Sequence, residues 1–134
     1  MALKEFTFRG KRMEELEKMS IDEFAQLLNA RGRRSLKRGV DSKLLKKIDE
    51  ARKETEKGNS KVIVRTHHRD MIVVPKMVGL KFGIHSGNEF QVVEVKKEML
   101  GHYLGEFALT RKKLRHGKAG IGATKSSTAI TARG

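Results

Sequence analysis

A chain of 134 residues has the length of a single domain. Its 30 Lys and Arg residues against 16 Asp and Glu residues give a net charge of +14, which disfavours a compact fold unless a polyanion such as nucleic acid neutralises it. The absence of cysteine excludes disulfides, thiol catalysis and zinc fingers, and one Tyr without any Trp argues against base stacking as the main mode of nucleic-acid binding.

Membrane association is the less favoured explanation of the positive charge. No apolar run approaches the roughly 18 residues that span a bilayer, and residues 1–10 contain no apolar signal-peptide segment. We therefore expect a soluble, cytoplasmic protein without membrane contact.

Residues 1–30 predict a helical N-terminal extension. Apolar and polar side chains alternate over residues 6–8, which suits a short edge strand or an anchor. Ser20 and Glu23 have the spacing of a capping box. We place the end of the helix that follows near Gly32, and its apolar face contains Ile21, Phe24, Ala25, Leu27 and Leu28.

The next segment, residues 31–47, contains eight basic residues and one Asp. Gly32 and Gly39 bracket its most basic part, which predicts a loop between two helices. A charge run is often only a solvated face, but no acidic run lies nearby and the whole chain is basic, which favours contact with nucleic acid. The residues predicted to contact RNA here are Arg33, Arg34, Lys37, Arg38 and Lys43.

Asp41 or Ser42 is expected to cap a second helix, which Gly58 and Asn59 end. The apolar face of this helix is predicted to contain Leu44, Leu45, Ile48, Ala51 and Thr55.

From Lys61 onward the hydrophobic period becomes that of strands. Strands are predicted over residues 62–65, 71–74, 79–85 and 89–95, with a tight turn at 86–88. The sequence thus predicts an α+β fold, with a small mixed sheet of three to four strands, N-terminal helices and an extended basic C-terminal tail.

The predicted core, residues 31–110, ends in a helical turn against the sheet. Leu100, Tyr103, Leu104 and Phe107 fall at helical spacing, while the glycines between them allow close backbone approach. Residues 111–134 follow as a basic tail that we expect to be disordered unless a partner orders it.

We find no arrangement of residues that predicts catalysis, a metal site or a cofactor. The five histidines lack a ligand-like spacing with acidic residues. Residues 120–126 resemble a phosphate-binding loop, but Thr124 occupies the position of a required glycine and Lys125 breaks the dinucleotide fingerprint. An enzyme is not expected.

Beyond the basic segment, we expect cationic and polar residues of the sheet region and tail to contact RNA. They are Arg65, His67, His68, Arg69, Lys76, Lys81, Asn88, Arg111, Lys112, Lys113, Arg115, His116, Lys118 and Lys125.

A set of residues within 86–110 has a defined, glycine-rich spacing. Its members are Ser86, Gly87, Asn88, Val95, Leu100, Gly101, Leu104, Gly105, Glu106, Phe107 and Thr110. This set resembles the signature of the family of ribosomal protein nineteen of the small subunit. Segments 34–39, 69–79 and 116–127 extend the resemblance. The last of these segments and the extension before Arg31 resemble the archaeal and eukaryotic branch, and Val40 departs from the Pro that is usual in bacterial members.

This resemblance implies a structural component of the head of the small ribosomal subunit that binds small-subunit ribosomal RNA. It also implies contact with the thirteenth small-subunit protein, and a tail directed towards tRNA near the decoding region. The alternative is a free-standing RNA-binding or RNA-chaperone module that uses the same basic surfaces.

Overall fold

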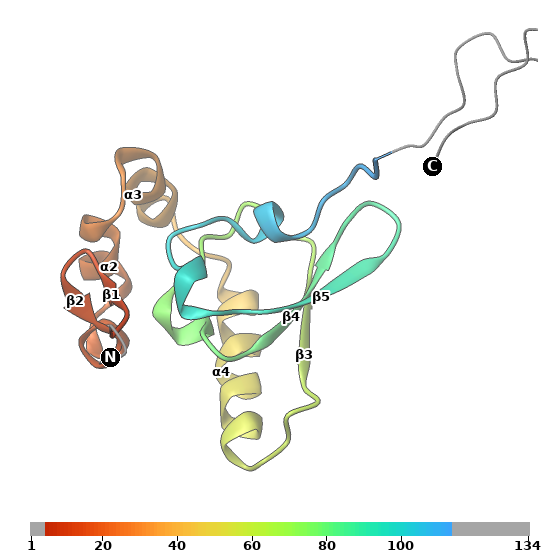
Figure 1. Cartoon of the computed structure of the whole chain (residues 1–134), viewed down its shortest axis with the longest axis horizontal. Helices are drawn as coiled ribbons and strands as arrows, with labels where there is room; N and C mark the ends of the chain where they lie inside the picture. The colour runs from red at the N-terminus through yellow and green to blue at the C-terminus, as the bar shows by residue number, and fades with distance from the viewer. Residues whose placement is uncertain (1–4, 114–134) are drawn as a thin grey trace, which may run out of the picture.

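The computed structural model describes residues 5–113, and Figure 1 shows the arrangement of its elements. Most of the predicted tail lies outside this range. The helices are α1 (Met13–Lys18), α2 (Ile21–Leu27), α3 (Ala30–Lys37) and α4 (Ser42–Glu56). The strands are β1 (Thr7–Phe8), β2 (Lys11–Arg12), β3 (Ile63–Thr66), β4 (Lys81–His85) and β5 (Phe90–Glu94), and 3-10 turns occupy Pro75–Met77, Lys97–Met99 and Leu104–Phe107. The predicted α+β class is confirmed.

The main sheet has three strands in the order β3-β4-β5. β3 runs parallel to β4, whereas β4 and β5 form an antiparallel hairpin, so the predicted mixed sheet is also confirmed. Gly87 adopts a φ of +114° in the hairpin turn, a conformation that favours glycine. The hairpin projects from the body of the molecule, beside the chain that leads to the C-terminus (Figure 1).

Helix α4 packs against one face of this sheet. Ile48 of the helix and Val64, Phe82 and Ile84 of the strands are buried in the same core. Ile63 and Val92 are 40% and 56% exposed. Because side chains alternate along a strand, these residues define an opposite sheet face that no described element covers.

The prediction of a regular strand over residues 71–74 is wrong. Its four residues are buried, and Ile72 makes a single bridge with Tyr103. The Val73 N–H donates to the carbonyl oxygen of His102 at 2.8 Å, and the Gly101 N–H donates to that of Val73 at 3.1 Å. The apolar run indicated burial correctly, but its backbone partner is a segment broken by glycine rather than a strand.

Local capping signals are confirmed at three helix ends. The Ser20 hydroxyl and the Glu23 carboxylate form the predicted capping box of α2. Asp41 caps α4, accepting from the Lys43 N–H at 3.0 Å. At the other end of α4, the N–H groups of Gly58 and Asn59 donate to the carbonyls of Thr55 and Glu54, the pattern of a Schellman motif. One part of the helix prediction is wrong, because Thr55 is exposed and its hydroxyl donates to the Ala51 carbonyl.

The N-terminal extension shares the core of the rest of the chain. Leu16 and Phe24 are almost completely buried in it, and the predicted edge strand exists as the β1-β2 hairpin. The division at residues 30 and 110 therefore does not correspond to separate hydrophobic cores, and it stays a prediction.

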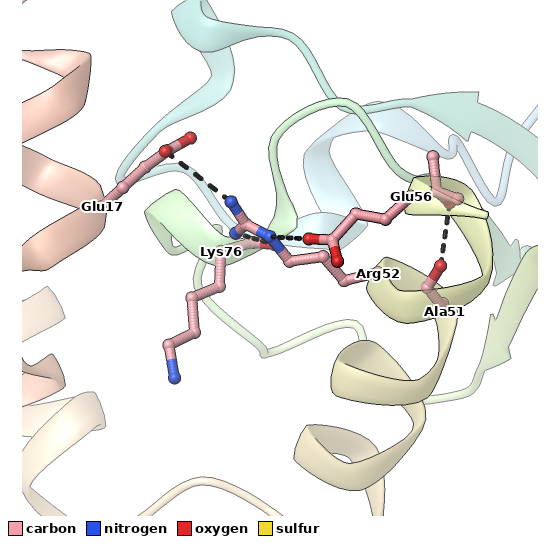
Figure 2. Close-up of polar contacts among 6 residues, drawn as sticks. Glu17, Ala51, Arg52, Glu56 and Lys76 are labelled. Carbon is pink, nitrogen blue, oxygen red and sulfur yellow. Dashed lines mark hydrogen bonds and ion pairs between the residues drawn. The ribbon is translucent and has the colours of Figure 1, made fainter. Parts of the chain in front are cut away.

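Arg52 connects the extension to α4, as Figure 2 shows. Its guanidinium lies 3.6 Å from the Glu17 carboxylate of α1 and 3.8 Å from that of Glu56, and it donates to the Lys76 carbonyl at 3.4 Å. The group is partly exposed, so this network orients α1 more than it stabilises the fold.

Gly101 and Gly105 lie at the close approaches predicted for them. Gly101 has a φ of +79°, and a Cβ there would lie 2.9 Å from Leu28 Cδ2. A Cβ on Gly105 would lie 3.0 Å from the Arg69 carbonyl oxygen. The predicted helical turn is reduced to the 3-10 turn Leu104–Phe107, because the positive φ at Gly101 breaks any longer helix.

We expect Gly101→Ala to lower the free energy of unfolding by about 2 kcal/mol, because it adds a clash with Leu28 to a strained φ. Gly79→Ala is the matched control: Gly79 has a φ of +84° but nothing within 4 Å of the added Cβ, so only about 1 kcal/mol should be lost. Urea denaturation measures both. Equal losses would show that the clash with Leu28 contributes nothing.

Candidate nucleic-acid interface

Helix α3 occupies the segment predicted as a basic loop, so that prediction is wrong. The Asn29 side chain caps the helix by accepting from the Gly32 N–H at 2.8 Å, and Gly39 ends it with a φ of +101°. A Cβ on Gly32 would lie 3.3 Å from Leu28 Cβ, so this glycine permits close packing after α2 rather than ending a helix. Arg, Lys and Leu between the glycines are good helix formers.

The helical period separates α3 into an apolar stripe and a basic surface. Gly32 and Leu36 are buried, four residues apart on one side. The chain has no acidic residue from 24 to 40, so nothing on α3 itself neutralises the charge. We call the exposed cations of this helix the α3 basic surface, which contains Arg31, Arg33, Arg34, Lys37 and Arg38.

The α3 basic surface is held in a fixed orientation. Arg33 donates to the Leu28 carbonyl at 3.3 Å, at the end of α2, and the hydroxyls of Ser35 and Tyr103 share a hydrogen bond of 3.3 Å. Within residues 5–113, the side chains of the other α3 cations form no hydrogen bond or ion pair. Their charges are therefore free to meet a partner.

A groove of about 590 Å³ continues this surface towards the sheet. Arg31 and Arg38 line one side, and His68 lies on the other with its Nε2 atom 3.1 Å from the Asp41 carboxylate. The full lining comprises Arg31, Ser35, Leu36, Arg38, Gly39, Val40, Asp41, Leu44, His68, Asp70, Met71, Ile72 and Tyr103. Guanidinium groups and a Tyr hydroxyl are donors suited to phosphate oxygens.

The predicted RNA-binding residues do not form one continuous patch. Helix α3 and the β4-β5 hairpin lie at opposite sides of the molecule in Figure 1. His68 lines the groove with Arg31 and Arg38, and Lys43 is exposed in the first turn of α4. The residues on or near the sheet and hairpin are Arg65, His67, Lys81 and Asn88, with Arg111, Lys112 and Lys113 exposed where the described chain ends. Arg115, His116, Lys118 and Lys125 lie outside the described residues.

Several of these side chains have partners within the protein. Lys81 donates to the Ser60 carbonyl at 3.2 Å, Lys112 lies 3.7 Å from the Glu89 carboxylate, and the Asn88 side chain accepts from the Ser86 hydroxyl at 3.4 Å. Lys76 is exposed on the 3-10 turn Pro75–Met77, away from α3 in sequence. The contacts of Lys81, Lys112 and Asn88 lie near the surface, so they are weak and can be exchanged for contacts with RNA.

Arg69 has a structural role that the sequence did not indicate. Its guanidinium donates to the carbonyl oxygens of His85 at 2.7 Å and Gly105 at 2.8 Å, and also to that of Ala108. It thereby joins the end of β4 to the segment that leads into the tail. The same donors are not available to phosphate while these bonds persist.

Two residues that the sequence did not single out lie in the candidate interface. Arg31 is exposed on α3 and lines the groove, and its place within the basic segment was the available signal. Phe90 lies against two histidines on the sheet, a contact that depends on strand register and has no local sequence signal.

Two further classes of site are absent from the part of the chain that the structure describes. Residues 5–113 contain no group of three side chains that could hold a metal ion. Within the same range, every helix is too short or too polar to cross a membrane.

A small basic α+β domain with one helix that carries several cations and no acidic residue is typical of proteins that bind RNA through the phosphate backbone. A family model described as ribosomal protein S19 matches residues 34–116, which is more than half of the chain. The chain belongs to the ribosomal protein S19 family. It is therefore a small-subunit ribosomal protein that binds ribosomal RNA, and its family is structural rather than enzymatic.

Proposed function

We propose that the protein is a structural component of the head of the small ribosomal subunit, where the α3 basic surface neutralises phosphates of small-subunit ribosomal RNA. The observation that carries this proposal is the set of five exposed cations on α3 within a stretch free of acidic residues. His68, which lines the adjoining groove, and Lys43, at the start of α4, add further contacts. Because a folded RNA presents phosphates in a fixed arrangement, a rigid basic helix favours a defined docking position.

The protein is further proposed to be of the archaeal and eukaryotic type. Support comes from the helices α1 and α2, which precede the family match and pack into the same core. The resemblance of segment 116–127 to that branch points in the same direction.

The tail is proposed to run from the core towards tRNA near the decoding region, beside the thirteenth small-subunit protein, in cytoplasmic ribosomes. The anchoring of residues 105 and 108 by Arg69 supports a fixed starting point for the tail, next to the hairpin. Arg111 and Lys113, together with Arg115, His116, Lys118 and Lys125, supply its charge.

Gradient sedimentation tests the placement of the full chain in the ribosome. We expect one copy per small subunit after a high-salt wash, because a protein docked at a defined site on folded RNA dissociates slowly even where salt weakens its phosphate contacts. A free-standing RNA chaperone would instead leave the particles and sediment near the top of the gradient.

Residue-level crosslinking of washed particles tests the finer proposals. Crosslinks from α3 to head ribosomal RNA, and from tail lysines to tRNA, are the expected result. Crosslinks confined to the body of the subunit would contradict the head location while leaving the family assignment intact.

A further inference from the structure

Four planar side chains gather on the sheet face that α4 leaves uncovered. Arg65 extends from β3, His67 directly follows that strand, and His85 and Phe90 are cross-strand partners in β4 and β5. Sequence spacing separates them by up to 25 positions, and only the sheet register brings them together. We call them the planar cluster.

The rings of the planar cluster support one another in defined geometry. His67 stacks on His85 with a centroid separation of 4.4 Å and an interplanar angle of 29°. Phe90 meets both histidines nearly edge-on, at 5.2 Å from His67 and 4.9 Å from His85. Because such pairs favour these arrangements, the rings form a preorganised aromatic surface. His67 is exposed, although His85 lies against one face of its ring.

Gly83 leaves room for the Arg65 side chain next to these rings. A Cβ on Gly83 would lie 3.2 Å from Arg65 Cγ, so a side chain at this position would crowd the arginine stem. The guanidinium carbon of Arg65 lies 5.6 Å from the Phe90 ring centroid, within the range of a cation–π contact. The cluster thus combines exposed ring surface with a fixed positive charge.

We propose that the planar cluster is a stacking site for an unpaired base of the ribosomal RNA. Unpaired bases in RNA loops and bulges stack on aromatic side chains and on Arg planes. The cluster contains no carboxylate. Glu94, on the same sheet face, lies opposite Lys81 in the strand register at the far end of the strands, so the charge favours RNA over a basic protein segment. This inference rests on the RNA binding proposed above and adds a site distinct from the α3 basic surface.

Paired substitutions at His67 distinguish stacking from other contacts. Affinity of the full chain for a small-subunit ribosomal RNA transcript should fall roughly 5- to 140-fold in His67→Leu, the range for losing one stacked base. The dependence of log affinity on log salt should stay unchanged, because the same number of phosphates is neutralised. His67→Phe should restore binding, because phenylalanine supplies a flat ring without a hydrogen-bond donor.

Val92→Ala is the matched control, since Val92 is exposed on the same face but outside the planar cluster. It should bind as the unmodified protein does, and far-UV circular dichroism should show every variant folded. Unchanged affinity in His67→Leu would overturn the stacking site, as would equal binding by the Leu and Phe variants. Neither result bears on the α3 basic surface. Replacing the cations of that surface is a separate experiment, in which the salt dependence of affinity is expected to change.

Discussion

Replacing Arg33, Arg34, Lys37 and Arg38 together by Ala is expected to weaken binding to a small-subunit ribosomal RNA transcript by roughly three to four orders of magnitude at 0.1 M salt. Each neutralised phosphate releases about 0.9 counterion, which corresponds to roughly eightfold in affinity at that concentration. The slope of log affinity against log salt should become shallower by about 0.9 for each phosphate that the variant no longer neutralises. Filter binding or fluorescence anisotropy between 50 and 200 mM salt measures both quantities.

The fold should survive this substitution because the four side chains are exposed and Ala favours a helix. Arg33 alone gives up hydrogen bonds, to the Gln26 and Leu28 carbonyls at 3.5 and 3.3 Å. The far-UV circular dichroism spectrum should therefore keep its helical intensity.

A second quadruple variant controls for the change in net charge. Lys46, Lys47, Lys53 and Lys57, which lie on α4 or at its end, are exposed, so their replacement by Ala removes the same charge from a different element. We expect a much smaller loss of affinity in this control. If both variants weaken binding equally, the interaction depends on overall charge and α3 is only a solvated surface.

Arg69→Ala is expected to lower the free energy of unfolding by about 3 kcal/mol. The variant leaves three backbone carbonyls without their charged donor, and unpaired groups in a partly buried site cost about 1–3 kcal/mol each, with some relief from water. Urea denaturation followed by circular dichroism measures the loss.

Two variants define the origin of this effect. Arg69→Lys keeps the charge but not the planar fork of donors, so we expect it to recover only a part of the lost stability. Arg111→Ala removes an exposed arginine further along the chain and should change stability by less than about 0.5 kcal/mol. Full stability in Arg69→Lys would show that charge, and not the fork geometry, joins the hairpin to the start of the tail.

The proposed stacking site on the planar cluster gives base stacking a local role in RNA binding. Composition argued against stacking as the main mode of RNA binding, since the chain has no Trp and one Tyr. Residue counts could not detect two histidines, a phenylalanine and an arginine assembled on one sheet face. The proposed electrostatic contact by α3 and the proposed stacking on the sheet are separate contributions, which their salt dependence distinguishes.

Local features of the fold could be predicted from the sequence because neighbours along the chain determine them. The capping box at Ser20 and Glu23 and the cap at Asp41 depend on groups within a few residues of one another. The turn at Gly87 is local too, since glycine permits the positive φ that a tight turn requires. The strongly basic composition and the family motifs likewise need no coordinates.

Only the tertiary structure decided how these pieces meet. In the sequence, Gly32 indicated the end of a helix. In the structure it lies inside α3, where its lack of a side chain allows close contact with Leu28. Nothing in the sequence distinguishes Arg69 from the other basic residues. In the fold, the hairpin and the segment that leads into the tail place three carbonyl oxygens around its guanidinium. Charge, capping and turn chemistry are properties of short segments, whereas the partners of a buried run, a glycine or an arginine depend on residues distant in sequence.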